Sequence, residues 1–122
     1  MRFVGLRTYG LQKGGIMLKK LSPAAFDEYV KKAKKPCLVM VSRDTCHVCE
    51  TVHPKLEALS EEYPDFPFYE VNVNQMQNLL LENRLKGVPQ TLFYKGGKVE
   101  SIITGDASED DFADKIDELL ED

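Results

Sequence analysis

The sequence has no long apolar run, and its first residues lack the apolar core of a secretory signal. A helix that crosses a bilayer needs about 18 to 20 apolar residues in a row, so we expect no membrane anchor. The opening segment, MRFVGLRTYGLQKGGIM, has charges and glycines where a signal peptide needs apolar residues. Basic residues are scattered without interleaved aromatic residues, which argues against nucleic-acid binding. We therefore expect a cytoplasmic protein.

Cysteine is also scarce, with three in 122 residues. Small secreted domains carry dense disulfide frameworks, whereas cytoplasmic disulfides are usually transient and chemical in purpose. Three cysteines therefore favour chemistry at one pair over a structural framework. Hydrophobic residues make up 43% of the chain and charged residues 30%, which is ordinary for a folded domain of this length.

The chain divides into a short leader and one domain. Residues 1–16 are rich in glycine and show no apolar period, so we interpret them as a flexible leader before a domain at 17–122. Helical patterns cover 23–33, 47–59, 75–84 and 108–120, and strand patterns cover 37–41, 68–73, 91–94 and 99–104. Strands separated by helices imply parallel pairing, and the last two strands form a hairpin. The predicted fold class is α/β, with a mixed central sheet of four or more strands flanked by helices.

The most informative segment is DTCHVCE, residues 44–50, which has two cysteines at the expected start of a helix. Free N–H groups and the helix dipole at such a terminus favour a thiolate, which makes Cys46 the expected nucleophile. Cys49, one turn deeper, is the expected resolving thiol, which attacks the mixed disulfide from within the same chain. A protonated His47 would stabilise the Cys46 thiolate further. We expect Cys46 to be partly exposed.

Other interpretations of the cysteines stay open at this point. Cys46, Cys49 and His53 could supply three metal ligands, although a closed structural zinc site needs four. The two cysteines could also be buried packing residues at chance spacing. Haem attachment needs a histidine directly after the second cysteine, and Glu50 stands there instead. Cys37 lies alone on an apolar strand, so we expect it to be inert packing.

From about residue 19 onward, the sequence resembles the thioredoxin family. The features that carry the resemblance are a C-x-x-C after a central apolar strand, a proline in the following helix, Gly-Val-Pro before the hairpin, and two later glycines. They are, in order, Cys46–Cys49, Pro54, Gly87–Pro89, Gly97 and Gly105. The resemblance implies a thioredoxin-like fold and a thiol–disulfide oxidoreductase that exchanges disulfides with protein substrates. It implies no cofactor or metal, electrons from a thioredoxin-reductase-like donor, and a monomer.

The same resemblance implies roles for residues around the dithiol. Cys46 looks like the attacking thiol and Cys49 like the resolving thiol. Pro89 is similar to the family's cis-proline, which faces the disulfide. On that reading, the preceding residue, Val88, presents its N–H and C=O groups to a substrate chain.

The sequence departs from the family pattern at several positions near the dithiol. Ser42 and Thr45 stand where tryptophan is usual, and His47 and Val48 replace the usual Gly-Pro between the cysteines. Met40 takes the place of a buried aspartate, and Glu70 takes the place of a lysine on the neighbouring strand. These differences suggest a divergent member with a narrower set of partners, and leave open a binding module that lost turnover.

Glu70 has two competing interpretations. Strand alternation puts it on the opposite face from Tyr69 and Val71, and the resemblance places it beside Met40. It could serve as the base for Cys49, which Met40 cannot do. The alternative is a solvent-facing glutamate on an edge of the sheet.

Overall fold

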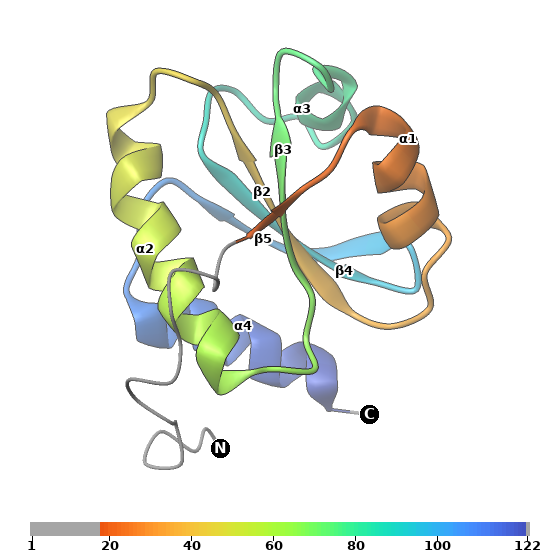
Figure 1. Cartoon of the computed structure of the whole chain (residues 1–122), viewed down its shortest axis with the longest axis vertical. Helices are drawn as coiled ribbons and strands as arrows, with labels where there is room; N and C mark the ends of the chain where they lie inside the picture. Colours follow the sequence, from red (N-terminus) through yellow and green to blue (C-terminus); the bar gives the residue numbers. More distant parts are fainter. Residues whose placement is uncertain (1–17, 122) are drawn as a thin grey trace.

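The computed structural model describes residues 18–121, so the expected leader at 1–16 lies outside the described residues. Its centre is a five-stranded sheet in the order β1-β3-β2-β4-β5 (Figure 1). The strands are β1 (Lys19–Lys20), β2 (Cys37–Ser42), β3 (Phe68–Asn72), β4 (Gln90–Lys95) and β5 (Lys98–Thr104). β1, β3 and β2 run parallel, whereas β4 and β5 are antiparallel to their neighbours. The prediction of a mixed α/β sheet is confirmed.

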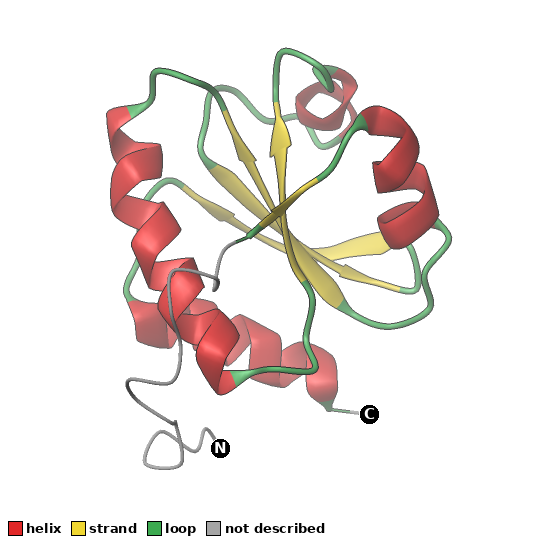
Figure 2. Cartoon of the chain, viewed as in Figure 1, coloured by secondary structure: helices red, strands yellow, loops and turns green. Residues whose placement is uncertain are grey.

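Helices cover both faces of this sheet, as Figure 2 shows. They are α1 (Pro23–Phe26), which continues as the π-helix η1 (Asp27–Lys31), α2 (His47–Glu62), α3 (Asn78–Glu82) and α4 (Glu109–Leu120). α2 and α4 lie on one face, and α1 and α3 lie on the other (Figure 1). Within residues 18–121, no helix is long and apolar enough to span a bilayer.

Two of the helices, α1 and α4, begin at serine residues whose side chains cap the helix. The Ser22 hydroxyl accepts the N–H of Ala25 at 3.2 Å, directly before Pro23 in the first helical turn. The Ser108 hydroxyl accepts the N–H of Asp111 at 3.0 Å. Each serine satisfies a donor that the helix itself leaves unpaired, which fixes where the helix starts.

Each face of the sheet has its own hydrophobic core. The α2–α4 core contains both motif cysteines together with buried residues of β2, α2, β4 and α4, chiefly Leu38, Met40, Val52, Leu56, Leu59, Phe93, Phe112 and Ile116. The α1–α3 core contains Cys37 and buried residues from the other side of the same strands, chiefly Phe26, Val30, Val39, Val41, Val71, Leu79, Leu92 and Tyr94. Because β2 is buried on both faces, its sequence reads as a continuous apolar run.

The structure differs from the sequence prediction at the ends of the elements. β1 was not predicted, because two lysines carry no strand pattern; they pair with Tyr69 and Glu70 of β3. α3 is shorter than the expected 75–84, and the segment 27–31 winds as a π-helix. Both differences are local, and neither moves the strands that position the dithiol.

Glycine is required in the turn that joins β4 to β5. Gly97 has a φ of +81°, and a side chain there would collide with the carbonyl oxygen of Lys31 at the end of η1. Only glycine combines this backbone conformation with so close an approach. The turn therefore packs directly against the C-terminal end of η1.

Candidate active site

The two motif cysteines lie where β2 leads into helix α2. Cys46 is the N-cap residue of α2, with extended backbone angles, and its Sγ atom accepts the N–H of Cys49 at 3.1 Å. A disulfide bond joins Cys46 to Cys49, whose Cα atoms are 5.2 Å apart. The pair therefore meets the N-terminal end of a 16-residue helix, where backbone N–H groups favour negative charge on sulfur.

The expectation that Cys46 is partly exposed is wrong for this disulfide form. Cys46 and Cys49 are both only 6% exposed. The Cys46 side chain turns toward the helix to reach Cys49, and both residues then join the α2–α4 core. His47 and Val48, which lie between them, are exposed instead.

The loop before β4 carries the expected cis-proline. The Val88–Pro89 peptide bond is cis, as the resemblance implied. Val88 is half-buried and packs against the core that contains the two cysteines. Among the described residues, no hydrogen bond uses the N–H or C=O of Val88, so these groups are available to a partner chain.

A buried glutamine, which the sequence did not single out, braces that loop. Gln90 is 1% exposed, and its side-chain amide donates to the carbonyl oxygens of Lys86 at 3.1 Å and Gly87 at 3.2 Å. Its own side-chain oxygen accepts the hydroxyl of Thr104 at 2.8 Å. The position directly after the cis-proline was the only available sequence signal for this role.

Glu70 lies inside the sheet and not on its edge, because β3 is covered by β1 on one side and β2 on the other. It is the register partner of Met40, and its side chain is 14% exposed. The Ser42 hydroxyl donates to Glu70 Oε2 at 2.7 Å. The interpretation of Glu70 as a solvent-facing edge residue is therefore wrong.

His53 is the second partner of Glu70. Its Nε2 atom lies 3.2 Å from Glu70 Oε1, and its Nδ1 atom lies 3.5 Å from Glu57 Oε2. In the sequence, His53 stood out only as a possible third metal ligand, yet its spacing of four residues from Cys49 was a usable signal. Residues four apart share a helix face, so the ring follows Cys49 along the same side of α2.

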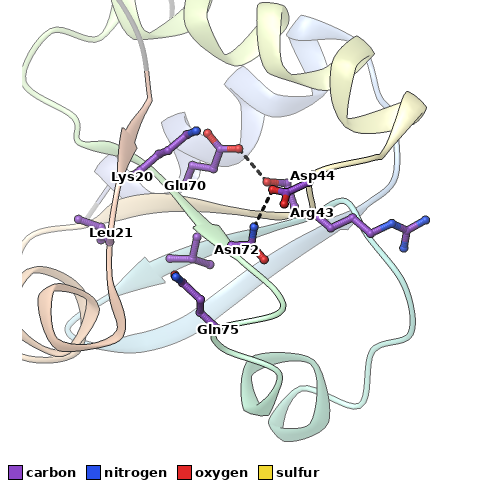
Figure 3. A pocket seen from close by; sticks show the side chains of 9 residues that line it. Lys20, Leu21, Arg43, Asp44, Glu70, Asn72 and Gln75 are labelled. Atoms are coloured by element: carbon purple, nitrogen blue, oxygen red, sulfur yellow. Dashed lines mark hydrogen bonds between the residues drawn. The ribbon is translucent and has the colours of Figure 1, made fainter.

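These side chains surround a hollow of about 140 Å³ beside the disulfide. Its lining includes Met40, Ser42, Cys46, Cys49, His53 and Glu70. A neighbouring hollow of about 350 Å³ opens at the carboxyl ends of β1, β2 and β3, and Ser42 and Glu70 also line that hollow (Figure 3). The hydrogen bond between Ser42 and Glu70 therefore lies at the boundary between the two.

Cys37 lies apart from this site, in the α1–α3 core. It is unpaired and 2% exposed, and desolvation by burial raises its pKa to about 12. A thiol in that state is protonated at neutral pH and hardly nucleophilic. Across residues 18–121, no group of three or more His, Cys, Asp or Glu side chains is arranged to hold a metal ion.

A disulfide between cysteines three apart, at the start of a helix and on this mixed sheet, is typical of thiol–disulfide oxidoreductases with a thioredoxin-like fold. The thioredoxin family model matches residues 17–118. The thioredoxin of Geodia cydonium is 30% identical over 94 residues, which cover 76% of this chain and 89% of that protein. The thioredoxin of Acidithiobacillus ferridurans is 30% identical over 86 residues, covering 70% and 80%. Thioredoxin-2 of Saccharomyces cerevisiae is 26% identical over 84 residues, covering 69% and 81%.

This chain belongs to the thioredoxin family. Family membership and the close cysteine pair together imply a redox function for Cys46 and Cys49.

Proposed function

We propose that this protein reduces disulfide bonds in protein substrates through the dithiol of Cys46 and Cys49. The observation that carries the proposal is the disulfide between these residues at the N-cap of α2. The helix terminus favours the thiolate of the N-cap residue, so Cys46 attacks the substrate and forms a mixed disulfide. Cys49 then attacks Cys46 and releases the substrate sulfur as a thiolate. The substrate disulfide is reduced, and the protein dithiol is oxidised to the disulfide.

The residues around the dithiol suit the docking of an extended substrate chain. Val88 has a free N–H and C=O among the described residues and precedes the cis-proline, Pro89. Val48 is 44% exposed and offers an apolar contact, and the exposed His47 can stabilise the Cys46 thiolate when protonated. We propose that Val88 pairs with the substrate backbone while Val48 and His47 select the side chains next to the reacting sulfur.

The partners that fit this chemistry are proteins with accessible disulfides and a thioredoxin-reductase-like electron donor. We also propose the cytoplasm as its compartment, because a carrier of electrons to disulfides works where other thiols are kept reduced. The proposed working form is a monomer, which sedimentation of the purified chain would test. Ser42 and Thr45 stand where the family pattern has large aromatic residues, which supports a narrow substrate range.

Insulin reduction in the presence of excess dithiothreitol tests the proposal. The protein should accelerate precipitation of the reduced insulin chains, and Cys49→Ser should trap insulin as a stable mixed disulfide on Cys46. Cys46→Ser should trap none. A folded protein that neither accelerates reduction nor traps insulin would support a binding module that kept the fold without turnover.

A further inference from the structure

Resolution of the mixed disulfide requires a proton acceptor for Cys49. The thiolate is the attacking form of cysteine, so Cys49 must lose its proton before it attacks Cys46. Cys49 is buried, and Met40, which lines the same hollow, has no group that accepts a proton readily. The inference below rests on the proposed function, because it assigns the residues that serve this one step.

Three carboxylates line the hollow beside Cys49, and only one of them is shielded from solvent. Asp44 and Glu50 are exposed, and Asp44 accepts the side-chain amide of Asn72 at 3.1 Å. Glu70 is 14% exposed and reaches the hollow from the middle of the sheet. Glu70 is therefore the best placed of the three to meet the buried Cys49 away from bulk solvent.

Two donors fix the direction of the Glu70 carboxylate. The Ser42 hydroxyl donates to one oxygen at 2.7 Å, and His53 Nε2 lies 3.2 Å from the other. The second nitrogen of His53 lies 3.5 Å from Glu57 Oε2, so a protonated ring faces a carboxylate at each end. His53 is therefore held between two acids and holds Glu70 in turn.

Other charged groups lie near the pair on the surrounding elements. Lys20 of β1 is the register partner of Glu70, and both side chains project toward α2 in Figure 3. Arg43, on the loop after β2, points away from Glu70 in the same view, and its Nε donates to the carbonyl of Thr45 at 3.0 Å. On α2, Glu57 faces the outer nitrogen of His53. The pH dependence of the pair reflects all of these groups together with Asp44 and Glu50.

We propose that Glu70 accepts the Cys49 proton and that His53 positions the Glu70 carboxylate for this transfer. The hollow of about 140 Å³ is large enough to admit water, which carries the proton where the two groups do not touch. The Cys49 S–H bond breaks and the proton passes to Glu70. A Cys46–Cys49 bond forms as the bond from Cys46 to the substrate sulfur breaks. The electron pair leaves on the substrate sulfur, which takes up a proton from Glu70 or solvent.

The reaction of the reduced, full-length protein with Ellman's reagent separates the two steps in a stopped-flow experiment. The first thionitrobenzoate is released when Cys46 attacks the reagent, and the second is released when Cys49 resolves the mixed disulfide. The variants are Glu70→Gln, which keeps the shape and can still accept from Ser42, and His53→Gln. The matched control is Glu61→Gln, which removes one carboxylate from α2 about two turns beyond His53.

We expect Glu70→Gln to slow the second release by about a hundredfold at neutral pH, the lower end of the usual effect of a general base. The slowing should shrink as the pH rises, because hydroxide then removes the Cys49 proton. His53→Gln should slow the same phase and shift its pH profile, and the double variant should be no slower than Glu70→Gln alone, since the two residues act as a unit. The first release should stay unchanged in every variant, and Glu61→Gln should match the parent protein in both phases.

An unchanged second phase and pH profile in Glu70→Gln, with a normal first phase, would overturn the assignment and leave the proposed function standing. If the slowing caused by Glu70→Gln and the slowing caused by His53→Gln multiply in the double variant, the role proposed for His53 is wrong. Circular dichroism would show whether Glu70→Gln folds. If it does not, His53→Gln becomes the test, and an unchanged pH profile of its second release would count against the proposal. A parent protein that shows no first release at all would instead contradict the proposed function.

Discussion

The two faces of the sheet show what makes a cysteine reactive in this protein. On the α2–α4 face, Cys46 and Cys49 stand at a helix N-terminus, beside a hollow lined by His53 and Glu70. On the α1–α3 face, Cys37 lies in a strand among apolar neighbours, and burial raises its pKa to about 12. All three cysteines belong to hydrophobic cores and are nearly inaccessible in this form.

The difference between the faces therefore lies in what surrounds the sulfur and not in how deeply it is buried. A helix terminus supplies N–H groups that favour a thiolate, and the hollow supplies polar partners. Cys37, by contrast, is a residue of strand β2 and does not stand at the start of a helix.

The largest expected effect is the loss of disulfide reduction when the nucleophile is removed. Cys46→Ser should reduce insulin turnover to the rate seen without protein, because no other thiol is placed to attack. Cys37→Ala is the matched control on the opposite face and should keep the parent rate. If Cys46→Ser keeps the parent activity, or if a folded Cys37→Ala loses it, the reactive thiol is not on the α2–α4 face.

The second prediction concerns labelling of the reduced protein with iodoacetamide near neutral pH. Burial raises the pKa of Cys37 from 9.0 to about 12, a difference of about three units, so its thiolate fraction falls about a thousandfold. Cys37 should therefore label about a thousandfold more slowly than a free cysteine, and faster only as the pH rises toward 12. Mass spectrometry of the digested protein would identify the labelled residue, and equal labelling of Cys37 and Cys46 would contradict the contrast.

The third prediction compares packing on the two faces. Leu56 on α2 and Leu79 on α3 are 0% and 1% exposed, one in each core. Leu56→Ala and Leu79→Ala should each lower the free energy of unfolding by about 3 kcal/mol, through lost burial and the cavity that remains. Urea unfolding measures both. A much smaller loss for Leu79→Ala would mean that the α1–α3 core is loosely packed, so that packing as well as chemistry separates the faces.

The smallest effect is expected at Thr91, a buried residue paired with Met40 on the α2–α4 face. Its hydroxyl is the one buried side-chain polar atom, among those the structure describes, without a hydrogen-bond partner. Thr91→Val should raise the free energy of unfolding by about 1 kcal/mol, because it removes an unsatisfied group and keeps the shape. Thr104→Val is the control, because it removes the hydroxyl that donates to Gln90 and should destabilise the protein. A loss of stability in Thr91→Val would show that its hydroxyl has a partner.

Local patterns in the sequence were enough to predict the main elements of the fold. An apolar run predicted β2, because a strand buried on both faces leaves little room for polar residues. Apolar residues at helical spacing predicted α2 and α4. The lysine strand β1 could not be predicted in this way, because its pairing with β3 depends on tertiary contacts.

The site was predictable where the resemblance supplied a pattern and less so where this chain departs from it. The cis peptide bond at Val88–Pro89 was predicted correctly. The burial of Cys46 was not, because exposure depends on where the side chain turns. The contact between His53 and Glu70 joins α2 to β3, and no local pattern in either segment specifies the distance between them.

The lysine strand β1 has a further consequence at the boundary of the sheet. Without β1, the edge of β3 that faces away from β2 would expose a row of backbone N–H and C=O groups. Such groups can pair with another molecule and start aggregation. β1 covers part of that row with two residues and places a lysine side chain on each. On the opposite boundary, β5 carries Lys98 and Glu100. Charged side chains at both edges, together with the short length of β1, thus oppose strand-to-strand association between molecules.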